Sequence, residues 1–101
     1  MVTINVLDHV ERCYSNDDGY TILNEVKKAF LSNQKVTLSF IGATSATSSF
    51  VNSALIELLE DYSFDYIRSN LQFVNTNKQI NDIIKSRFRF ETNKKKEALS
   101  V

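Results

Sequence analysis

Residues 36–62 most constrain what this chain can fold into, because their hydrophobic pattern changes period part-way along. The stretch begins with VTLSFI, in which apolar and polar side chains alternate as they do in a β-strand. Gly42 ends this strand, and a run of small hydroxyl residues follows it. The next apolar residues recur at helical spacing and form one stripe: Val51, Ala54, Leu55, Leu58 and Leu59. The stretch therefore predicts a strand, a hydroxyl-rich turn and an amphipathic helix that continues to about Tyr62.

The segment before residue 36 predicts a further strand and helix. Residues 2–7, VTINVL, alternate in the same way as the first strand described. The sequence SNDD at 15–18 offers side chains that cap a helix N-terminus, and the helix is expected to run to about Leu31. Asn33 suits the end of that helix, because asparagine tolerates left-handed backbone. The predicted apolar stripe consists of Ile22, Leu23, Val26, Ala29 and Phe30.

The segment after residue 62 predicts one more strand and one more helix. Residues 64–69 fit neither period clearly, whereas LQFV at 71–74 predicts a strand. Thr76 and Gln79 have the spacing of a capping box, which opens a helix that ends near Arg89. The apolar side of this helix is predicted to carry Ile80, Ile83, Ile84 and Phe88.

These elements alternate in the order β-α-β-α-β-α. Such an order predicts an α/β fold with right-handed crossovers and a mainly parallel sheet packed against amphipathic helices. A length of 101 residues fits a single domain. We assign residues 1–90 to that domain and residues 91–101 to a polar, basic tail that is predicted to be disordered.

The cysteine count and the absence of long apolar runs indicate the cellular compartment in which the protein is expected. Cys13 is the only cysteine, so no internal disulfide forms within the chain. The N-terminus lacks a basic region followed by an apolar run, and no stretch approaches the roughly 20 apolar residues that cross a membrane. We therefore expect a cytoplasmic protein without a membrane partner. His9 and Cys13 are four residues apart, but two ligands do not make a metal site, and no cofactor is predicted.

The sequence offers no recognisable catalytic machinery, so we expect a protein that is not an enzyme. A phosphate-binding loop needs several glycines between strand and helix, and only Gly42 occurs in this turn. No Gly-x-Ser-x-Gly elbow is present, and no base accompanies the serines. Asp17 and Asp18 are adjacent acids at a helix start, where carboxylates usually cap.

The charge is balanced overall but divided along the chain. Residues 1–77 hold five basic and nine acidic residues, whereas residues 78–101 hold seven basic and three acidic residues. The basic residues could contact nucleic acid: Lys78, Lys85, Arg87, Arg89, Lys94, Lys95 and Lys96. Only Phe88 and Phe90 are interleaved with them as stacking aromatics, so the sequence favours a protein partner over a nucleic acid.

The hydroxyl-rich turn has two interpretations. In the structural one, Thr47 or Ser48 caps the central helix and the neighbouring hydroxyls satisfy the turn backbone. In the functional one, an exposed hydroxyl accepts a phosphate, whose roughly −1.5 to −2 charges alter an interface with little change of fold. The candidate partner-binding surface comprises Thr44, Ser45, Thr47, Ser48, Ser49, Asn52 and Ser53.

Three segments of the chain together resemble the STAS, or anti-sigma factor antagonist, fold. They are the predicted strand VTLSFIGA, the Ser49-Phe50 pair that opens a helix, and the later segment LQFVNTN. The resemblance covers about residues 15–90 and is nearest to divergent STAS-like proteins of bacteria and phages. The best known STAS proteins bind a serine kinase that uses ATP and doubles as an anti-sigma factor. That kinase phosphorylates a serine in an Asp-Ser-Ser-Gly-like motif, which aligns with residues 47–50 and makes Ser48 the matching acceptor. Thr47 and Phe50 depart from that motif, since they replace its acid and its glycine.

The resemblance implies a non-catalytic regulatory module that binds a protein, such as a kinase-like ATPase, and is switched by phosphorylation at Ser48. An inhibitor of a host protein, encoded by a phage or mobile element, is an alternative that needs the same kind of surface. Nucleic-acid contact through the basic C-terminal region is the other alternative. The sequence leaves the oligomeric state open.

Overall fold

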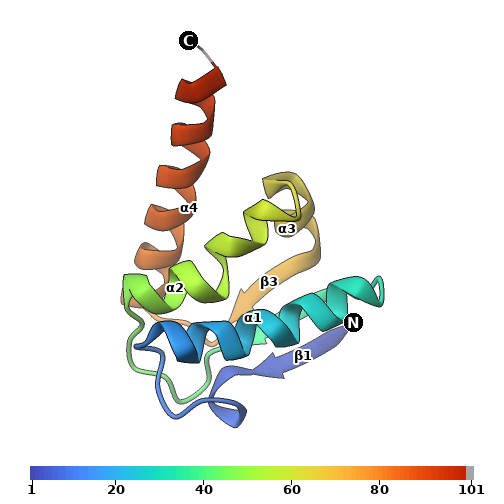
Figure 1. The fold of residues 1–101 in the computed structure, drawn as a ribbon. Helices are drawn as coiled ribbons and strands as arrows, with labels where there is room; N and C mark the ends of the chain where they lie inside the picture. The colour runs from blue at the N-terminus through green and yellow to red at the C-terminus, as the bar shows by residue number, and fades with distance from the viewer. Residues whose placement is uncertain (100–101) are drawn as a thin grey trace.

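The computed structural model describes the backbone of residues 1–99 and the side chains of residues 1–93. Three parallel strands and four α-helices form the α/β fold that the sequence predicts (Figure 1). The strands are β1 (Val2–Asn5), β2 (Val36–Ser39) and β3 (Leu71–Val74). The α-helices are α1 (Asn16–Leu31), α2 (Ser48–Ala54), α3 (Phe64–Asn70) and α4 (Lys78–Leu99). The first strand is shorter than predicted, because the 3₁₀-helix η1 (Val6–Asp8) follows Asn5 directly.

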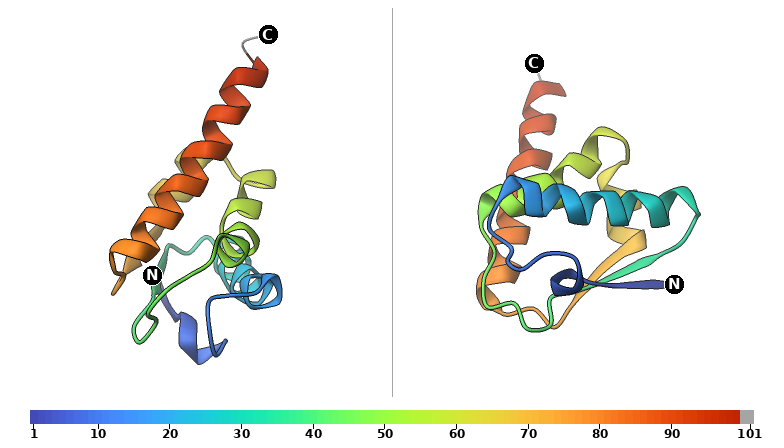
Figure 2. Two further views of the ribbon diagram at one scale, coloured as in Figure 1. Left: turned by 90° about the vertical axis from the view of Figure 1, so that its left-hand side faces the viewer. Right: turned by 60° about the horizontal axis from the view of Figure 1, so that its bottom comes forward.

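The strands lie in the order β1-β2-β3, so both crossovers return to the adjacent position. Right-handed crossovers of this kind place their helices on the same face of the sheet. Figures 1 and 2 show α1 and the segment that contains α2 and α3 on that one face. Helix α4 packs mainly against α2. The protein is therefore a two-layer structure in which one face of the sheet carries no helix.

The two faces of the sheet differ in polarity, as the register requires. Side chains alternate across a strand, so residues paired in register share a face. Ile4 pairs with Leu38, which pairs with Phe73, and these apolar side chains face the helices. The next register row, Thr37 with Gln72, faces the other side, where Gln72 donates to the Thr37 hydroxyl at 2.8 Å. The uncovered face is thus polar and needs no second layer of helices.

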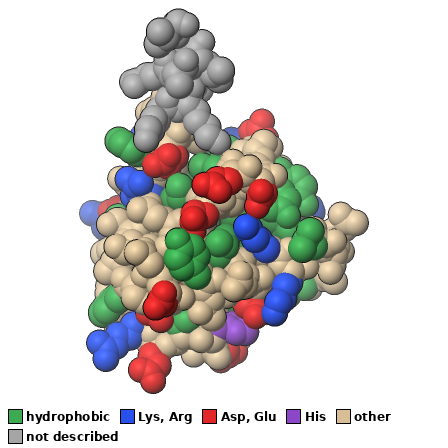
Figure 3. Space-filling view, viewed as in Figure 1, with side chains coloured by type: hydrophobic (Ala, Val, Ile, Leu, Met, Phe, Trp, Pro, Cys, Tyr) green, Lys and Arg blue, Asp and Glu red, His purple; other side chains and the backbone are tan. Residues whose placement is uncertain are grey.

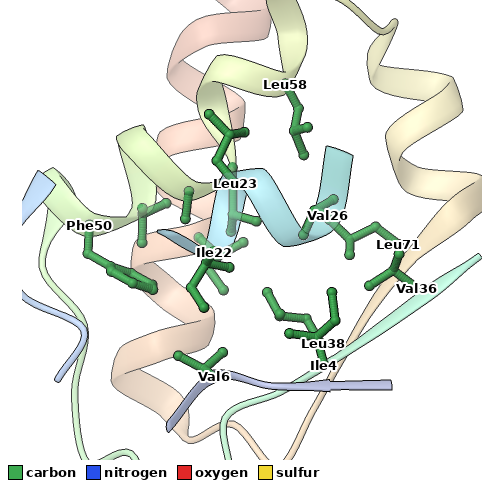
Figure 4. Close-up of a cluster of buried hydrophobic side chains, with 14 of the residues drawn as sticks. Ile4, Val6, Ile22, Leu23, Val26, Val36, Leu38, Phe50, Leu58 and Leu71 are labelled. Atoms are coloured by element: carbon green, nitrogen blue, oxygen red, sulfur yellow. The ribbon is translucent and has the colours of Figure 1, made fainter. Parts of the chain in front are cut away.

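The hydrophobic core fills the space between the sheet and the helices. Figure 4 shows side chains from α1, among them Ile22 and Val26, pointing toward Leu38 on the central strand. Phe50 enters the same cluster from α2 and is completely buried. All residues of the two apolar stripes predicted for the first and second helices are buried. The hydrophobic pattern therefore identified the core correctly.

Helix α1 confirms the predicted signals at both of its ends. The Ser15 hydroxyl accepts from the Asp18 amide at 3.1 Å, and the Asp18 carboxylate accepts from the Ser15 amide at 3.4 Å. This is a reciprocal capping box. Asn33 has a φ of 58°, the left-handed conformation expected just after the helix.

Helices α1 and α2 approach each other closely at Gly19. A Cβ atom placed on Gly19 would lie 2.6 Å from the Ser53 Cβ and 2.7 Å from the Phe50 carbonyl oxygen. Both distances are shorter than van der Waals contact, so only glycine fits at this crossing. The missing side chain is what allows α2 to lie directly on α1.

The predicted continuous helix from the turn to Tyr62 is wrong. Helix α2 ends at Ala54, Leu55 departs from helical geometry with a φ of −125°, and the 3₁₀-helix η2 (Ile56–Glu60) follows. The break still leaves Leu55 and Leu58 fully buried. Packing against the core therefore decides the path of the chain here. The ambiguous segment after Tyr62 forms α3, which Ser63 caps by accepting from the Tyr66 amide at 3.1 Å.

The start and the end of α4 also differ from the prediction. The Asn77 side chain caps the helix by accepting from the Ile80 amide at 2.9 Å, so the capping box assigned to Thr76 and Gln79 is wrong. The helix continues to Leu99 and includes most of the segment predicted to be a disordered tail. Residues 100–101 of that segment lie outside the described residues.

Candidate functional site

The hydroxyl-rich turn follows the C-terminal end of β2 and lies beside the starts of α1 and α2 (Figures 1 and 2). Ala46 forms an isolated parallel bridge with Cys13, and the Thr47 amide donates to the Cys13 carbonyl oxygen at 3.0 Å. The Gln79 side chain, on α4, forms two hydrogen bonds with the turn. Its Oε1 accepts from the Ala46 amide at 2.9 Å, and its Nε2 donates to the Ala46 carbonyl oxygen at 2.8 Å. The turn is therefore fixed from two sides.

Thr47 has a structural role, as one interpretation of the sequence predicted. Its hydroxyl accepts from the Phe50 amide at 3.2 Å and so caps α2. The same hydroxyl donates to the Tyr14 carbonyl oxygen at 2.6 Å. Ser45 donates to the Tyr14 phenol at 3.2 Å, and the Thr44 carbonyl oxygen accepts from Asn77 at 2.8 Å. These contacts tie the turn to the segment before α1 and to the cap of α4.

Ser48 and Ser49 differ from their neighbours because both are exposed. Neither hydroxyl makes a hydrogen bond to any residue that the structure describes. They occupy the first two positions of α2, directly after its cap. These two side chains, like that of the exposed Thr44, carry hydroxyls that a partner or an enzyme can reach without breaking a contact within the protein.

The two α2 residues in the predicted surface have different environments. Asn52 is half-buried, and its Oδ1 accepts from Arg87 Nε at 2.7 Å, which links α2 to α4. Ser53 is only 4% exposed, and its hydroxyl donates to Asn16 Oδ1 at 2.9 Å. The structure therefore corrects the expectation for Ser53. Its side chain lies at the crossing of α1 and α2 and does not reach the surface.

Sequence reasoning did not include Tyr14 and the start of α1 in the surface. Tyr14 is 44% exposed and contacts the turn through both its backbone and its phenol. Asn16 and Asp17 are exposed beside it. We call the exposed residues at the two helix starts the α1–α2 corner: Tyr14, Asn16, Asp17, Ser48 and Ser49. No local signal in the sequence brings these segments together, because they are joined by contacts between distant residues.

The described residues contain no cluster that could hold a metal ion, and Cys13 is buried among them. No group of three or more His, Cys, Asp or Glu side chains is close enough among them to hold a metal ion. Cys13 is buried, and burial, with a smaller contribution from the Asp18 carboxylate, raises the pKa of its thiol to about 11. The thiol is thus protonated at neutral pH, which makes it a poor nucleophile. No helix in the described part of the chain is long and apolar enough to cross a membrane.

Comparison with protein families finds a match over residues 18–81 to a STAS-like domain of unknown function (DUF4325). The matched segment is more than half of the 101-residue chain and contains β2, the hydroxyl-rich turn and α2. The chain belongs to this family. No curated protein and no solved structure matches the chain. The family match confirms the STAS-like resemblance seen in the sequence, and the function of this STAS-like domain has to be argued from its surface.

The hydrogen bonds between Gln79 and the turn lead to a testable prediction. Replacing Gln79 with alanine removes two hydrogen bonds from the Ala46 backbone, and we expect a loss of about 1–2 kcal/mol in the free energy of unfolding. The Ala46 amide should also exchange its hydrogen faster, because its acceptor is lost. Urea unfolding and amide hydrogen exchange measure the two effects. Lys78→Ala, at the exposed neighbouring position, is the control. Equal hydrogen exchange of the Ala46 amide in both variants would contradict the role given to Gln79.

Proposed function

We propose that this STAS-like domain is a non-catalytic regulatory module that binds a protein partner through the α1–α2 corner. The observation that carries the proposal is the exposure of Ser48 and Ser49 on a turn that the protein holds in place at Ala46 and Thr47. A fixed and accessible surface of this kind costs little conformational entropy on binding. Tyr14 adds an exposed aromatic ring, a type of side chain that is enriched at protein interfaces.

The switch in this proposal is phosphorylation of Ser48. A serine kinase would transfer the γ-phosphoryl group of ATP to Ser48 Oγ, releasing ADP and the hydroxyl proton. Because the Ser48 side chain is exposed, the phosphate meets no steric barrier inside the protein. It adds about −1.5 to −2 charges to a corner that already carries the exposed Asp17 carboxylate. The added charge would weaken contact with a partner that binds the unphosphorylated corner.

The resemblance to anti-sigma factor antagonists favours a kinase-like ATPase as that partner. An inhibitor that blocks a host protein would use the same corner, and only the identity of the partner would differ. The proposal places the domain in the cytoplasm, where a lone buried thiol such as Cys13 stays reduced.

Nucleic-acid contact through the basic C-terminal region receives less support. Arg87 donates to Asn52 and to Glu91 Oε1 at 3.2 Å, so its guanidinium is engaged within the protein. Lys94, Lys95 and Lys96 lie outside the residues whose side chains are described. We therefore do not propose this function.

Ser48→Asp is predicted to abolish capture of the partner while leaving the fold intact. The aspartate places a negative charge on the corner but removes no hydrogen bond among the described residues, so the midpoint of thermal unfolding should change little. The measurement is affinity capture from native cells by the immobilised full chain, with quantitative identification of bound proteins. Mass spectrometry of the protein purified from those cells should find phosphate on Ser48.

Two variants serve as controls for this experiment. Ser48→Ala should keep partner binding, because it adds no charge to the corner. Ser86→Asp makes the same charge change at an exposed serine in the middle of α4 and should also keep binding. Equal recovery of the same partner by wild type and Ser48→Asp would exclude the switch. Equal loss with Ser48→Asp and Ser86→Asp would show that total charge, and not the corner, determines binding.

A further inference from the structure

A second surface of the protein is an apolar groove of about 430 Å³ on the helix-covered side of β3. It is bounded by the two helices that flank β3 in the sequence, α3 before it and α4 after it. Its apolar lining consists of Phe64, Ile67, Leu71, Phe73 and Phe88. The Phe64 and Phe88 rings lie 5.5 Å apart and connect the two walls. The groove shares no residue with the α1–α2 corner.

Three cationic side chains line the same groove: Arg68 from α3, and Lys85 and Arg89 from α4. All three are exposed, and none of the described residues that line the groove is acidic. Arg68 lies 3.0 Å from Asp65, but both side chains of this pair are largely solvated, so the pair is weak and leaves Arg68 available. An apolar floor with a basic rim is complementary to an apolar segment that carries carboxylates.

The backbone of β3 adds a third feature, because β3 is an edge strand of the sheet. The Phe40 amide donates to the Val74 carbonyl oxygen at 3.1 Å, and Val74 is in register with Ser39. In a parallel pair, alternate residues direct their backbone groups toward and away from the partner strand. The backbone groups of Phe73 therefore point away from β2, toward the open edge. An unpaired edge of this kind can accept another strand.

We propose that an extended segment of a partner protein pairs with the open edge of β3 and fills this groove. Strand addition supplies main-chain hydrogen bonds, while pockets for alternate side chains supply specificity. The segment would place apolar side chains on Phe73 and Phe88 and carboxylates near Lys85 and Arg89. A second copy that paired through its own β3 fits less well, since its Arg68, Lys85 and Arg89 would meet a rim of the same sign.

The test begins with selection of random peptides on the full chain, using displayed peptides of about nine residues, the length of a long strand. Enriched peptides are expected to alternate apolar and polar residues and to carry Asp or Glu. Synthetic labelled peptides of the enriched sequence are then titrated by fluorescence anisotropy. Lys85→Glu should weaken binding by about tenfold or more, because it reverses one charge on the rim. Lys28→Glu makes the same charge change on α1, outside the groove, and should change the affinity less than about twofold.

Further arms separate this surface and this mode of binding from others. Ser48→Asp should leave peptide affinity unchanged, so failure of the groove and failure of the corner are distinguishable. Methylation of alternate backbone nitrogens in the peptide should abolish binding, because strand pairing needs those donors. Absence of enrichment, equal weakening by Lys85→Glu and Lys28→Glu, or undiminished binding of the methylated peptide would overturn the proposal. Sedimentation that shows a dimer abolished by Lys85→Glu would assign the groove to a second copy instead.

Discussion

Gly19→Ala is expected to destabilise the protein by about 1–3 kcal/mol, although alanine is the better helix former. Helix propensity alone predicts the opposite sign, since alanine gains roughly 0.8–1 kcal/mol over glycine inside a helix. The new Cβ would lie 2.6 Å from the Ser53 Cβ and 2.7 Å from the Phe50 carbonyl oxygen, and the second of these is rigid backbone. Helix α2 must then move away from α1, so overpacking outweighs the gain in propensity. Urea unfolding of the two proteins measures the difference.

Two other variants test this explanation. Asn24→Ala, at an exposed position of the same helix, should leave stability unchanged or raise it by a few tenths of a kcal/mol. Ser53→Gly removes the atom nearest to the new alanine Cβ, so a double-mutant cycle should show favourable coupling with Gly19→Ala. A stabilising Gly19→Ala would show that the two helices do not cross as closely as the structure places them.

Phe50→Ala is expected to cost about 3–5 kcal/mol, the largest effect we predict. The Phe50 ring is completely buried in the cluster of Figure 4, and its removal leaves a cavity in the core. This is close to the whole stability of many small domains, so urea unfolding should show a large fall in the midpoint. Phe50 stands where the Asp-Ser-Ser-Gly-like motif has glycine, and its buried ring fills space that a glycine would leave empty.

Phe90→Ala is the matched control for the buried phenylalanine. Phe90 is 55% exposed, and its ring lies 5.1 Å from the Arg87 guanidinium carbon. Its truncation removes the same atoms from the surface and should cost less than about 1 kcal/mol. Similar losses for both variants would contradict the placement of Phe50 in the core.

Local sequence signals predicted the elements of this fold well. The capping box at Ser15, the left-handed Asn33 and the stripe that includes Val26 each depend on neighbouring residues, and all are confirmed. The strands were also predicted from a local pattern, the alternation of apolar and polar side chains over a few residues. The parallel order followed because strands and helices alternate along the chain.

The errors share a different cause, since each depends on residues distant in the sequence. Leu55 continues the apolar stripe of a helix, yet packing in the core ends α2 there. Gln79 has the spacing of a local cap, but its side chain instead binds Ala46, which is 33 residues away. Contacts with distant residues compete with these local signals, and they exist only in the folded structure.

The candidate surface was predicted in part. Ser48 and Ser49 are exposed as the functional interpretation requires, whereas Ser53 is turned inward by the close approach of α1 at Gly19. Nothing in the spacing of the hydroxyl residues distinguishes these positions. The groove beside β3 was also not foreseen, because residues from α3, β3 and α4 form it only after the chain has folded.

Figure 3 shows acidic and basic side chains intermixed on the face that carries α1, where Lys27 and Asp61 lie 3.0 Å apart. The hydroxyl-bearing end lies where the chain turns into α2. Cys13, Tyr14 and Gln79 form hydrogen bonds with that end, so its backbone already has one arrangement before a partner binds. A macromolecule that docks there meets a shape that does not need to rearrange. Association at this end should therefore be fast, and differences in affinity between variants should appear chiefly in the lifetime of the complex.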